Sequence, residues 1–353
     1  MSRVRERKLL EQAAALGIQA VVLTSRENMR YFTGYAGEGA ALIAPELRRI
    51  ITDSRYTEQA ARQAEGYGVA DIGRATLAEF VLAGLREAGA DTVGFEDNAM
   101  TVSEYRKLEG AGISFTGIGL IGERIRAVKE DSEIEIMRRA ARLTDEGFAH
   151  ILPFIRPGVS EYDIMAEMDY FFARRGASPA FPMIVASGPN GSMPHAETGP
   201  RQIQPGDMIT MDFGATVDGY RSDMTRTVAV GEPDPTLREV YAIVLKAQLT
   251  ALDAASAGMT GRELDAAARR IIGDAGYGPQ FGHALGHGVG LAVHEQPRLS
   301  SKNEEPLEPG MIVTIEPGIY LPGLGGVRIE DTALITGDGC EPLLESAKEL
   351  IVL

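Results

Sequence analysis

A diverged internal repeat in the second part of the chain restricts its possible folds more than any other feature. RPGVSEYDIMAEM, from Arg156, aligns with SAGMTGRELDAAA, from Ser256, at an offset of 100 residues. Further on, PGDMITMDFG aligns with PGMIVTIEPG, which places Asp212 against Glu316. Each unit is typical of a helix that begins at a Ser or Thr cap and is followed by a loop and strands. The repeat predicts two similar α/β halves around an approximate twofold axis, with acidic strand ends from both halves at the centre.

The part of the chain that precedes the repeat predicts a separate domain. Before residue 125, apolar runs alternate with helical stretches, which is the pattern of a small α/β domain. An amphipathic helical segment that begins near Lys129 opens the remainder. Since 353 residues exceed the usual size of a single core, two domains are the ordinary expectation. We therefore expect domains at residues 1–125 and 126–353, both of mixed α/β (α+β) class.

Composition narrows the possible partners and the location. A formal net charge of -15 argues against a nucleic-acid partner, because phosphates are held mainly by clustered Lys and Arg. No apolar run approaches the length that spans a bilayer, and the first residues lack the apolar core of a secretory signal. The single cysteine, Cys340, fits a reducing compartment. Together these features predict a cytoplasmic protein without a membrane partner.

Two aspartates are predicted to lie side by side in a buried hairpin. MITMDFGATVDGYRSDMTRTVAV turns at an Asp-Gly pair, residues 218–219, which suits a tight hairpin turn. In that register Asp212 lies opposite Thr225, and Asp223 is the diagonal neighbour of Asp212 on the same face. Because two buried carboxylates repel each other and lose hydration, they need a cation or a shared proton.

Two glutamates repeat this arrangement in the second half. In TIEPGIYLPGLGGVRIEDTALI, Glu316 and Glu330 lie symmetrically about Gly323 in a segment that turns through Pro and Gly. Arg328 comes two residues before Glu330 and therefore lies on the same side of the strand. Four carboxylates on two apolar hairpins are difficult to explain as surface residues.

The segment FGHALGHGVGLAVHE, residues 281–295, holds three of the five histidines of the chain. His287 is the best candidate ligand, since its flanking glycines let the backbone approach closely and turn sharply. With the four carboxylates it forms an oxygen-rich set that suits Mn²⁺, Co²⁺, Fe²⁺ or Zn²⁺, and two ions could share bridging carboxylates. Each residue alone also fits a structural role, such as a helix cap or an ion pair. The combination is what indicates a metal centre.

MDFG followed by SDMTRT, HALGHGVGLAVHE, IEPGIY and VRIED form a series of motifs along the second part of the chain. The series closely resembles the pita-bread metallopeptidases, the family of methionine aminopeptidase, aminopeptidase P and prolidase. VVLTSRENMRYFTGY resembles the start of the creatinase-type N-terminal domain of the proline-directed members. The resemblance implies a creatinase-type domain at residues 1–125 and a pita-bread catalytic domain at residues 126–353.

The resemblance also implies two divalent metal ions, held by Asp212, Asp223, His287, Glu316 and Glu330. Mn²⁺ or Co²⁺ are the expected ions, and Zn²⁺ and Fe²⁺ are also compatible. Two cations would lower the pKa of a bridging water and supply hydroxide near neutral pH. Glu316 is expected to serve as general base besides its metal contact. No ligand of the family is missing, which counts against creatinase.

Further residues are implied to contact the substrate. In relatives, the histidines that match His195 and His294 line the pocket, and here they are expected to stabilise the tetrahedral intermediate or to hold the bond next to proline. His283, Tyr320 and Arg328 complete the expected set of substrate-binding residues.

Arg298 bears on the choice between two activities. It lies where prolidases tend to place an arginine that pairs with the free carboxylate of a dipeptide. We therefore predict hydrolysis of the Xaa-Pro bond of dipeptides. An aminopeptidase P that acts on longer peptides is the alternative. A homodimer is expected as well, because relatives with this N-terminal domain are commonly dimeric.

Two functions other than peptidase activity are alternatives. A non-catalytic pita-bread binding module typically loses ligands, whereas all five are present here, and metal analysis separates the two. A phosphate-binding loop in GHALGHGVG is disfavoured, because no Lys follows the glycines and the spacing is not that of a P-loop.

Overall fold

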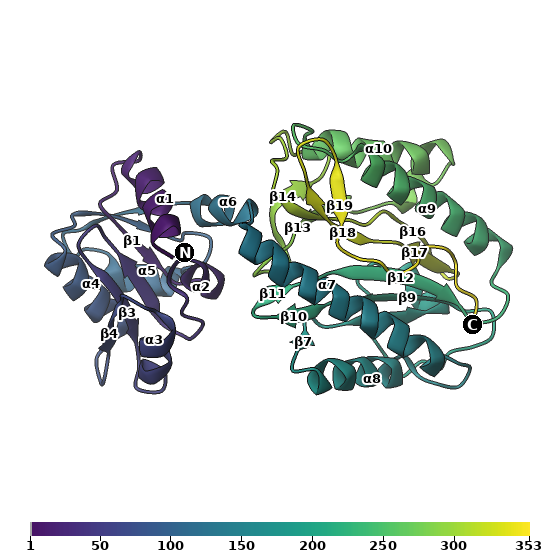
Figure 1. Ribbon diagram of the computed structural model, residues 1–353, viewed down its shortest axis with the longest axis horizontal. Helices are drawn as coiled ribbons and strands as arrows, with labels where there is room; N and C mark the ends of the chain where they lie inside the picture. The colour runs from purple at the N-terminus through teal and green to yellow at the C-terminus, as the bar shows by residue number, and fades with distance from the viewer. Residues whose placement is uncertain (1) are drawn as a thin grey trace. The chain divides into compact units, whose positions relative to one another are not determined.

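The computed structural model describes residues 2–353, and the chain divides into two compact units between Arg126 and Ala127. The N-terminal unit is a small α/β domain with a six-stranded mixed sheet in the order β4-β3-β2-β1-β5-β6 (Figure 1). Its strands are β1 (Ala20–Leu23), β2 (Ala40–Ile43), β3 (Arg48–Thr52), β4 (Gly68–Asp71), β5 (Thr92–Phe95) and β6 (Ser114–Gly117). Its helices are α1 (Ser2–Ala14), α2 (Arg26–Thr33), α3 (Thr57–Gln63), α4 (Leu77–Glu87), α5 (Val102–Leu108) and α6 (Ile121–Ala127).

The C-terminal unit combines four long helices with several short antiparallel sheets (Figure 1). The helices are α7 (Asp131–Ile151), α8 (Glu161–Arg174), α9 (Pro235–Ala254) and α10 (Gly261–Asp274), with 3₁₀ turns η1 (Leu152–Phe154), η2 (Gly188–Ser192) and η3 (Gly278–Gln280). The strands of the first half are β7 (Ser178–Pro179), β8 (Ile184–Ser187), β9 (Met208–Phe213), β10 (Ala215–Val217), β11 (Tyr220–Arg221) and β12 (Met224–Ala229). Those of the second half are β13 (Gly286–Gly288), β14 (Glu295–Leu299), β15 (Ile312–Ile315), β16 (Gly318–Leu321), β17 (Gly325–Arg328), β18 (Asp331–Ile335) and β19 (Cys340–Pro342).

The predicted repeat is confirmed in the pairs of matching elements. Helices α8 and α10 begin one residue after Ser160 and Thr260, and in each the cap hydroxyl accepts a hydrogen bond from the backbone N–H three residues on. In each the carboxylate of that third residue accepts a hydrogen bond from the backbone N–H of the cap, which completes a capping box. The strand order β8-β9-β12 of the first half also corresponds to β13-β15-β18 of the second. The acidic residues of both halves therefore lie at the ends of equivalent strands.

The hairpin of the first half has the predicted register. Asp212 pairs with Thr225, and the turn residues Asp218 and Gly219 adopt φ values of 46° and 77°. The ladder is interrupted at Gly214, however, so that β9 with β12 and β10 with β11 belong to different sheets. A Cβ atom at Gly214 would lie 1.9 Å from the carbonyl oxygen of Ser222, so only glycine permits this close approach.

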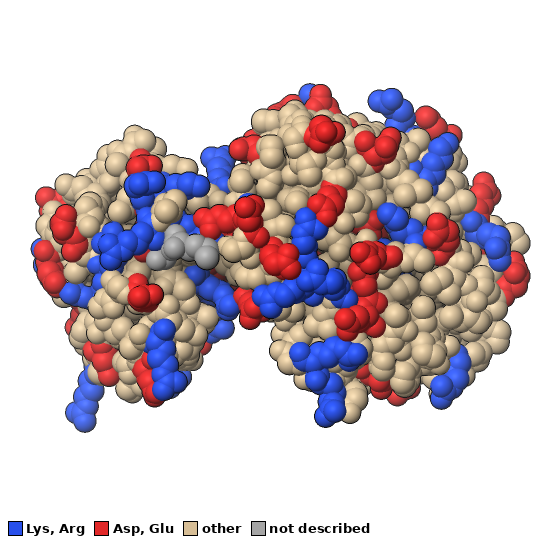
Figure 2. Space-filling view, viewed as in Figure 1, with Lys and Arg blue, Asp and Glu red and all other residues tan. Residues whose placement is uncertain are grey.

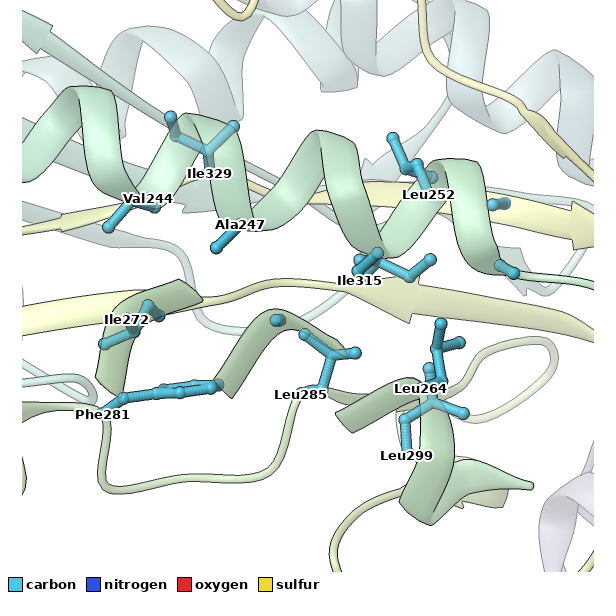
Figure 3. Close-up of a cluster of buried hydrophobic side chains, with 14 of the residues drawn as sticks. Val244, Ala247, Leu252, Leu264, Ile272, Phe281, Leu285, Leu299, Ile315 and Ile329 are labelled. Atoms are coloured by element: carbon cyan, nitrogen blue, oxygen red, sulfur yellow. The ribbon is translucent and has the colours of Figure 1, made fainter. Parts of the chain in front are cut away.

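The apolar core of the C-terminal unit lies directly behind the acidic strand ends. Helix α9 packs beside α10 and against β15, β16 and β17. Figure 3 shows the side chains that meet there, which are Val244, Ala247, Leu252, Leu264, Ile272, Phe281, Leu285, Leu299, Ile315 and Ile329. Ile315 and Ile329 are fully buried neighbours of Glu316 and Glu330. Since burying one such side chain stabilises the fold by about 1.5–3 kcal/mol, these anchors fix the backbone that carries the glutamates.

The surface carries charges of both signs. Basic side chains are interspersed with acidic ones on the face shown in Figure 2. Among the described residues, no helix combines the length and the apolar character that crossing a membrane requires.

Candidate metal centre

A cavity of about 450 Å³ opens in the C-terminal unit. Its walls contain all five predicted metal ligands, Asp212, Asp223, His287, Glu316 and Glu330. The predicted substrate residues His195, His283, His294, Arg298 and Arg328 also line it. An apolar wall, which the sequence analysis did not anticipate, is formed by Phe181, Pro182, Ile184, Pro194 and Val293. The structure thus brings together side chains that are up to 149 residues apart in the chain, from Phe181 to Glu330.

The ligand candidates come from both halves of the repeat. Asp212 lies in β9 and Asp223 directly precedes β12, while Glu316 directly follows β15 and Glu330 directly precedes β18. One donor atom each of Asp223, His287 and Glu330 lie within 4.8 Å of one another. Since metal–ligand bonds are about 2.0–2.2 Å long, two donors of one ion lie at most about 4.4 Å apart, so these three atoms are close to the spacing that one ion needs.

The imidazole of His287 is oriented for binding through Nε2. Its Nδ1 is 3.0 Å from the carbonyl oxygen of Gly288, and because a carbonyl only accepts, Nδ1 carries the proton. The lone pair of Nε2 then faces the carboxylates, at 3.3 Å from Glu316 Oε1 and 3.8 Å from Asp223 Oδ2. Backbone hydrogen bonding of the distal nitrogen is the usual arrangement for a metal-binding histidine.

The glycines beside His287 have only one of the two predicted roles. Neither adopts the positive φ of a sharp turn, because residues 286–288 form strand β13 between β14 and β15. A Cβ atom on Gly286 would lie 2.0 Å from the Thr314 carbonyl oxygen, and one on Gly288 would lie 2.1 Å from that of Gln296. The prediction of close backbone approach is confirmed, and the prediction of a turn is wrong.

The electrostatics of the cluster favour a bound cation. Burial and the neighbouring carboxylates, Glu330 foremost, raise the pKa of Asp223 well above its usual range. Burial, Glu316 and Asp212 have the same effect on the pKa of Glu330. Burial also raises the pKa of Asp212, although Arg328 opposes that shift. Buried carboxylates that repel one another in this way gain most from a bound divalent cation.

Glu316 differs from the other three carboxylates. Burial disfavours its charged form, but His287, whose Nε2 lies 3.3 Å from Oε1, together with His283 and Arg328 lowers its pKa to about 2. Moreover, Oδ1 of Asp212 is buried and has no hydrogen-bond partner among the described residues. A bound cation would neutralise the ionised glutamate and would give the buried aspartate oxygen a partner. The donor set therefore fits divalent metal ions.

Arg328 occupies the wall of the cavity, but the protein uses most of its donors. It donates to Asp212 Oδ2 at 2.6 Å, to Tyr320 Oη at 2.9 Å, to Thr225 Oγ1 at 3.0 Å and to the Pro194 carbonyl oxygen at 3.1 Å. A guanidinium has five N–H donors, so four of them are engaged. Arg328 is thus placed to orient a candidate ligand, and a direct contact with substrate stays a prediction.

Tyr320 and His283 form a continuation of this network. Tyr320 is buried and does not line the cavity, and its hydroxyl lies 2.9 Å from His283 Nε2. The other ring nitrogen of His283, Nδ1, is 2.8 Å from the Ala284 carbonyl oxygen. Burial lowers the pKa of His283, so the neutral ring accepts from the tyrosine. The structure gives Tyr320 a supporting place behind the cavity, in contrast to its predicted place beside the substrate.

His195 and His294 are the histidines that remain available. Both are exposed on the cavity, and within residues 2–353 no hydrogen bond engages either ring. The His294 ring lies edge-on to that of His287, with centroids 4.4 Å apart. Partial burial of the ring, together with the neighbouring His287 and Arg298, lowers the pKa of His294 to about 4. A neutral His294 can donate or accept a hydrogen bond at neutral pH.

Sequence reasoning missed the residues that support the cluster. Thr225 donates to Glu330 Oε2 at 2.7 Å, and its position opposite Asp212 could have indicated this contact. Behind it, the buried Arg226 donates to Asp331 Oδ1 at 2.8 Å and to the carbonyl oxygen of Glu330. Asp331 also accepts from Lys348 at 2.6 Å. This ion pair connects β12 of the first half with β18 of the second.

Comparison with known proteins agrees with this geometry. Residues 135–337 match the profile of metallopeptidase family M24. The chain belongs to metallopeptidase family M24. Residues 5–128 match the creatinase/prolidase N-terminal domain, so this M24 member has the two-domain arrangement that its motifs predict.

The relatives of this M24 peptidase include proline-directed enzymes that match it over nearly its whole length. A structure titled Xaa-Pro dipeptidase from Bacillus anthracis superposes with a TM-score of 0.96 and 43% identity over 100% of both chains. The Xaa-Pro dipeptidase of Pyrococcus horikoshii is 35% identical and covers 98% of each chain. A structure titled X-Pro aminopeptidase from Thermotoga maritima has a TM-score of 0.92 and 36% identity over 99% of both chains. These matches show that the chain has the pita-bread fold and is a peptidase that uses divalent metal.

Proposed function

We propose that this M24 peptidase hydrolyses the Xaa-Pro bond of dipeptides with the help of two divalent metal ions. The observation that carries the proposal is the cavity in which the five-residue donor set faces exposed imidazoles and the exposed Arg298. Residues 126–353 form the catalytic domain in this proposal.

The donor set has a specific division of labour in this proposal. Asp212, Asp223, His287, Glu316 and Glu330 hold the ions, of which Mn²⁺ or Co²⁺ are the expected ones. Bound divalent ions supply an activated water near neutral pH and a Lewis acid for the scissile carbonyl. The ionised Glu316 takes a proton from the attacking water at Oε2 and returns it to the departing proline nitrogen.

The rest of the cavity accounts for the choice of substrate. The apolar wall of Phe181, Pro182 and Ile184 suits a proline ring, which offers apolar surface and no N–H donor. His195 and His294 supply hydrogen bonds to the peptide and to the oxyanion that develops in the transition state. Arg298 binds the free carboxylate of the proline, because a guanidinium can hold a carboxylate through two parallel hydrogen bonds.

Arg298 has the accessibility that this role needs. The side chain is exposed on the cavity and forms no ion pair within the described part of the chain. It is thus available to a ligand, unlike Arg328. An aminopeptidase that accepts longer peptides is the second candidate, and the similarity to the Thermotoga structure supports it.

The test is hydrolysis of Ala-Pro, Ala-Pro-Ala and Ala-Ala by metal-stripped protein, before and after addition of Mn²⁺ or Co²⁺. We expect metal-dependent cleavage of Ala-Pro, with Ala-Ala as the control for proline preference. Preference for Ala-Pro-Ala would make the protein an aminopeptidase. No cleavage with either metal would favour a binding module of the same fold.

Three further expectations accompany the proposal. Metal analysis should give two ions for each chain. Light scattering should show a homodimer, as the resemblance to two-domain relatives suggests. Cell fractionation should place the protein in the cytoplasm.

A further inference from the structure

A buried carboxylate outside the donor set closes the loop that carries His195. Glu161 is the first residue of α8, and its exposed fraction is 0%. Its Oε1 accepts from the Ser187 backbone N–H and from the Ser187 hydroxyl, both at 2.7 Å. Its Oε2 accepts from the Gly199 backbone N–H at 3.0 Å, and Asn190 Nδ2 lies 3.1 Å from Oε1.

The contacts with Ser187 and Gly199 lie at the two ends of one loop. Residues 187–199 leave strand β8 at Ser187, pass through η2 and return to Gly199 beside the start of α8. Pro194 and His195, which line the cavity, lie between the two ends. A single carboxylate thus bridges the neck of the loop, and hydrogen bonds to an ionised acceptor are about twice as strong as neutral ones.

The middle of the loop is fixed by close backbone packing. A Cβ atom on Gly326 of β17 would lie 2.1 Å from the Gly191 carbonyl oxygen, so η2 rests directly on that strand. Arg328, from the same strand, donates to the Pro194 carbonyl oxygen at 3.1 Å. The position of His195 therefore depends on the contact with β17 and on the closed neck.

The second half holds its own histidine-bearing segment in a comparable way. Asp265 of α10, which is 1% exposed, accepts from the Leu285 backbone N–H at 3.1 Å and from Arg269 at 2.8 Å. Arg269 in turn donates to the carbonyl oxygens of Phe281 and His283, at 2.9 Å and 2.8 Å. Helices α8 and α10 are equivalent in the repeat. Each half therefore uses a buried carboxylate on its equivalent helix to hold the segment that carries a cavity histidine.

We propose that Glu161 is a positioning residue for the peptidase reaction, which holds His195 against the substrate by closing the neck of loop 187–199. Glu161 touches neither the cavity nor the donor set, so its effect must pass through the loop. The inference rests on the proposed function for its kinetic consequence. The closure of the neck itself is independent of that function.

The experiment is a double-mutant cycle with Glu161→Gln and His195→Ala. The amide keeps the size of the side chain but turns an N–H₂ group toward donors at the neck. We expect a fall in kcat/KM of about 10²-fold, the order that a displaced positioning group costs. In the His195→Ala background the same change should cost no more than about twofold, because its effect passes through that histidine.

Asp265→Asn is the matched control, since it loosens the segment of His283 and leaves loop 187–199 in place. The losses in kcat/KM caused by Asp265→Asn and by His195→Ala should multiply in the double variant.

Bound metal should be unchanged in Glu161→Gln. Hydrogen exchange at the Ser187 and Gly199 amides should accelerate in Glu161→Gln but not in Asp265→Asn. Ser187→Ala and Asn190→Ala, which remove single donors, should show the same pattern at smaller amplitude and replace Glu161→Gln if that variant does not fold.

Three results would overturn the proposal. They are equal costs of Glu161→Gln in both backgrounds, a loss of bound metal that parallels the loss of activity, and unchanged exchange at the two amides. An inactive wild-type protein would instead contradict the proposed function, and exchange would then decide alone whether Glu161 closes the neck.

Discussion

Removing one carboxylate from the candidate metal centre should stabilise the metal-free protein. Asp223 is 4% exposed, and within the described residues no hydrogen bond engages its carboxylate. One oxygen of Asp223 and one of Glu330 lie within 4.8 Å. At an effective dielectric constant of about 20, two unit charges at that distance repel by roughly 3 kcal/mol. Since Arg328 offsets part of this repulsion, we expect Asp223→Asn to gain about 1–3 kcal/mol without metal.

The gain has a definite pH dependence. The pKa of Asp223 is raised in the folded state, so the folded protein binds more protons than the unfolded one. Metal-free wild-type protein therefore loses stability as the pH rises from about 4, the ordinary aspartate value, through the raised pKa. Asparagine does not titrate, so the difference between variant and wild type should be small at pH 5 and larger at pH 8.

Thermal unfolding in EDTA and in Mn²⁺ measures both effects. At 2–4 °C for each kcal/mol, the EDTA midpoint should rise by roughly 2–12 °C at pH 8. In Mn²⁺ the wild-type protein should have the higher unfolding midpoint, because only it keeps the full donor set and gains the full free energy of metal binding.

Asp331→Asn is the matched control. Asp331 is a neighbouring buried carboxylate, 0% exposed, whose charge is paired with Arg226. Its removal should destabilise the protein by about 3–5 kcal/mol with or without metal. If Asp223→Asn were destabilised in EDTA at every pH, as Asp331→Asn should be, the repulsion argument would be refuted.

Four further outcomes are expected. His287→Ala should abolish both activity and metal retention, measured by elemental analysis, so a variant that keeps either would remove its assignment as a ligand. His294→Ala should retain metal but lose at least about 10²-fold in kcat, the lower end for an oxyanion donor, and full turnover would leave it a structural residue. Arg298→Ala should raise KM for Ala-Pro about tenfold or more and leave Ala-Pro-Ala nearly unchanged, whereas equal effects would exclude a carboxylate contact. Because burial raises the pKa of the Cys340 thiol to about 11, alkylation should still accelerate between pH 9 and pH 10, and a plateau below pH 9 would contradict that shift.

The register of the hairpins could be predicted from the sequence, because side chains alternate with a period of two and an Asp-Gly turn fixes the pairing. That reasoning correctly placed Thr225 opposite Asp212. The helix starts of the repeat were equally accessible, since Ser160 and Thr260 are local capping signals.

Contacts between distant segments could not be predicted in this way. Nothing local to Arg328 indicates that Pro194 and Asp212 take its donors, so it was assigned to substrate. The glycines beside His287 predict a sharp turn as well as a close backbone approach, because a sequence does not show which strands lie beside them. The supporting role of Glu161 escaped notice for the same reason, since its partners lie more than 25 residues away.

The division of the donor set between the two halves of the repeat has a consequence for measurement. Asp212 and Asp223 belong to the first half, and His287, Glu316 and Glu330 belong to the second. Metal affinity should therefore report how accurately the two halves pack against each other. A substitution that shifts the halves by a fraction of an ångström should release metal before circular dichroism detects any loss of helix. Metal retention is therefore the more sensitive test for substitutions that disturb the packing between the two halves.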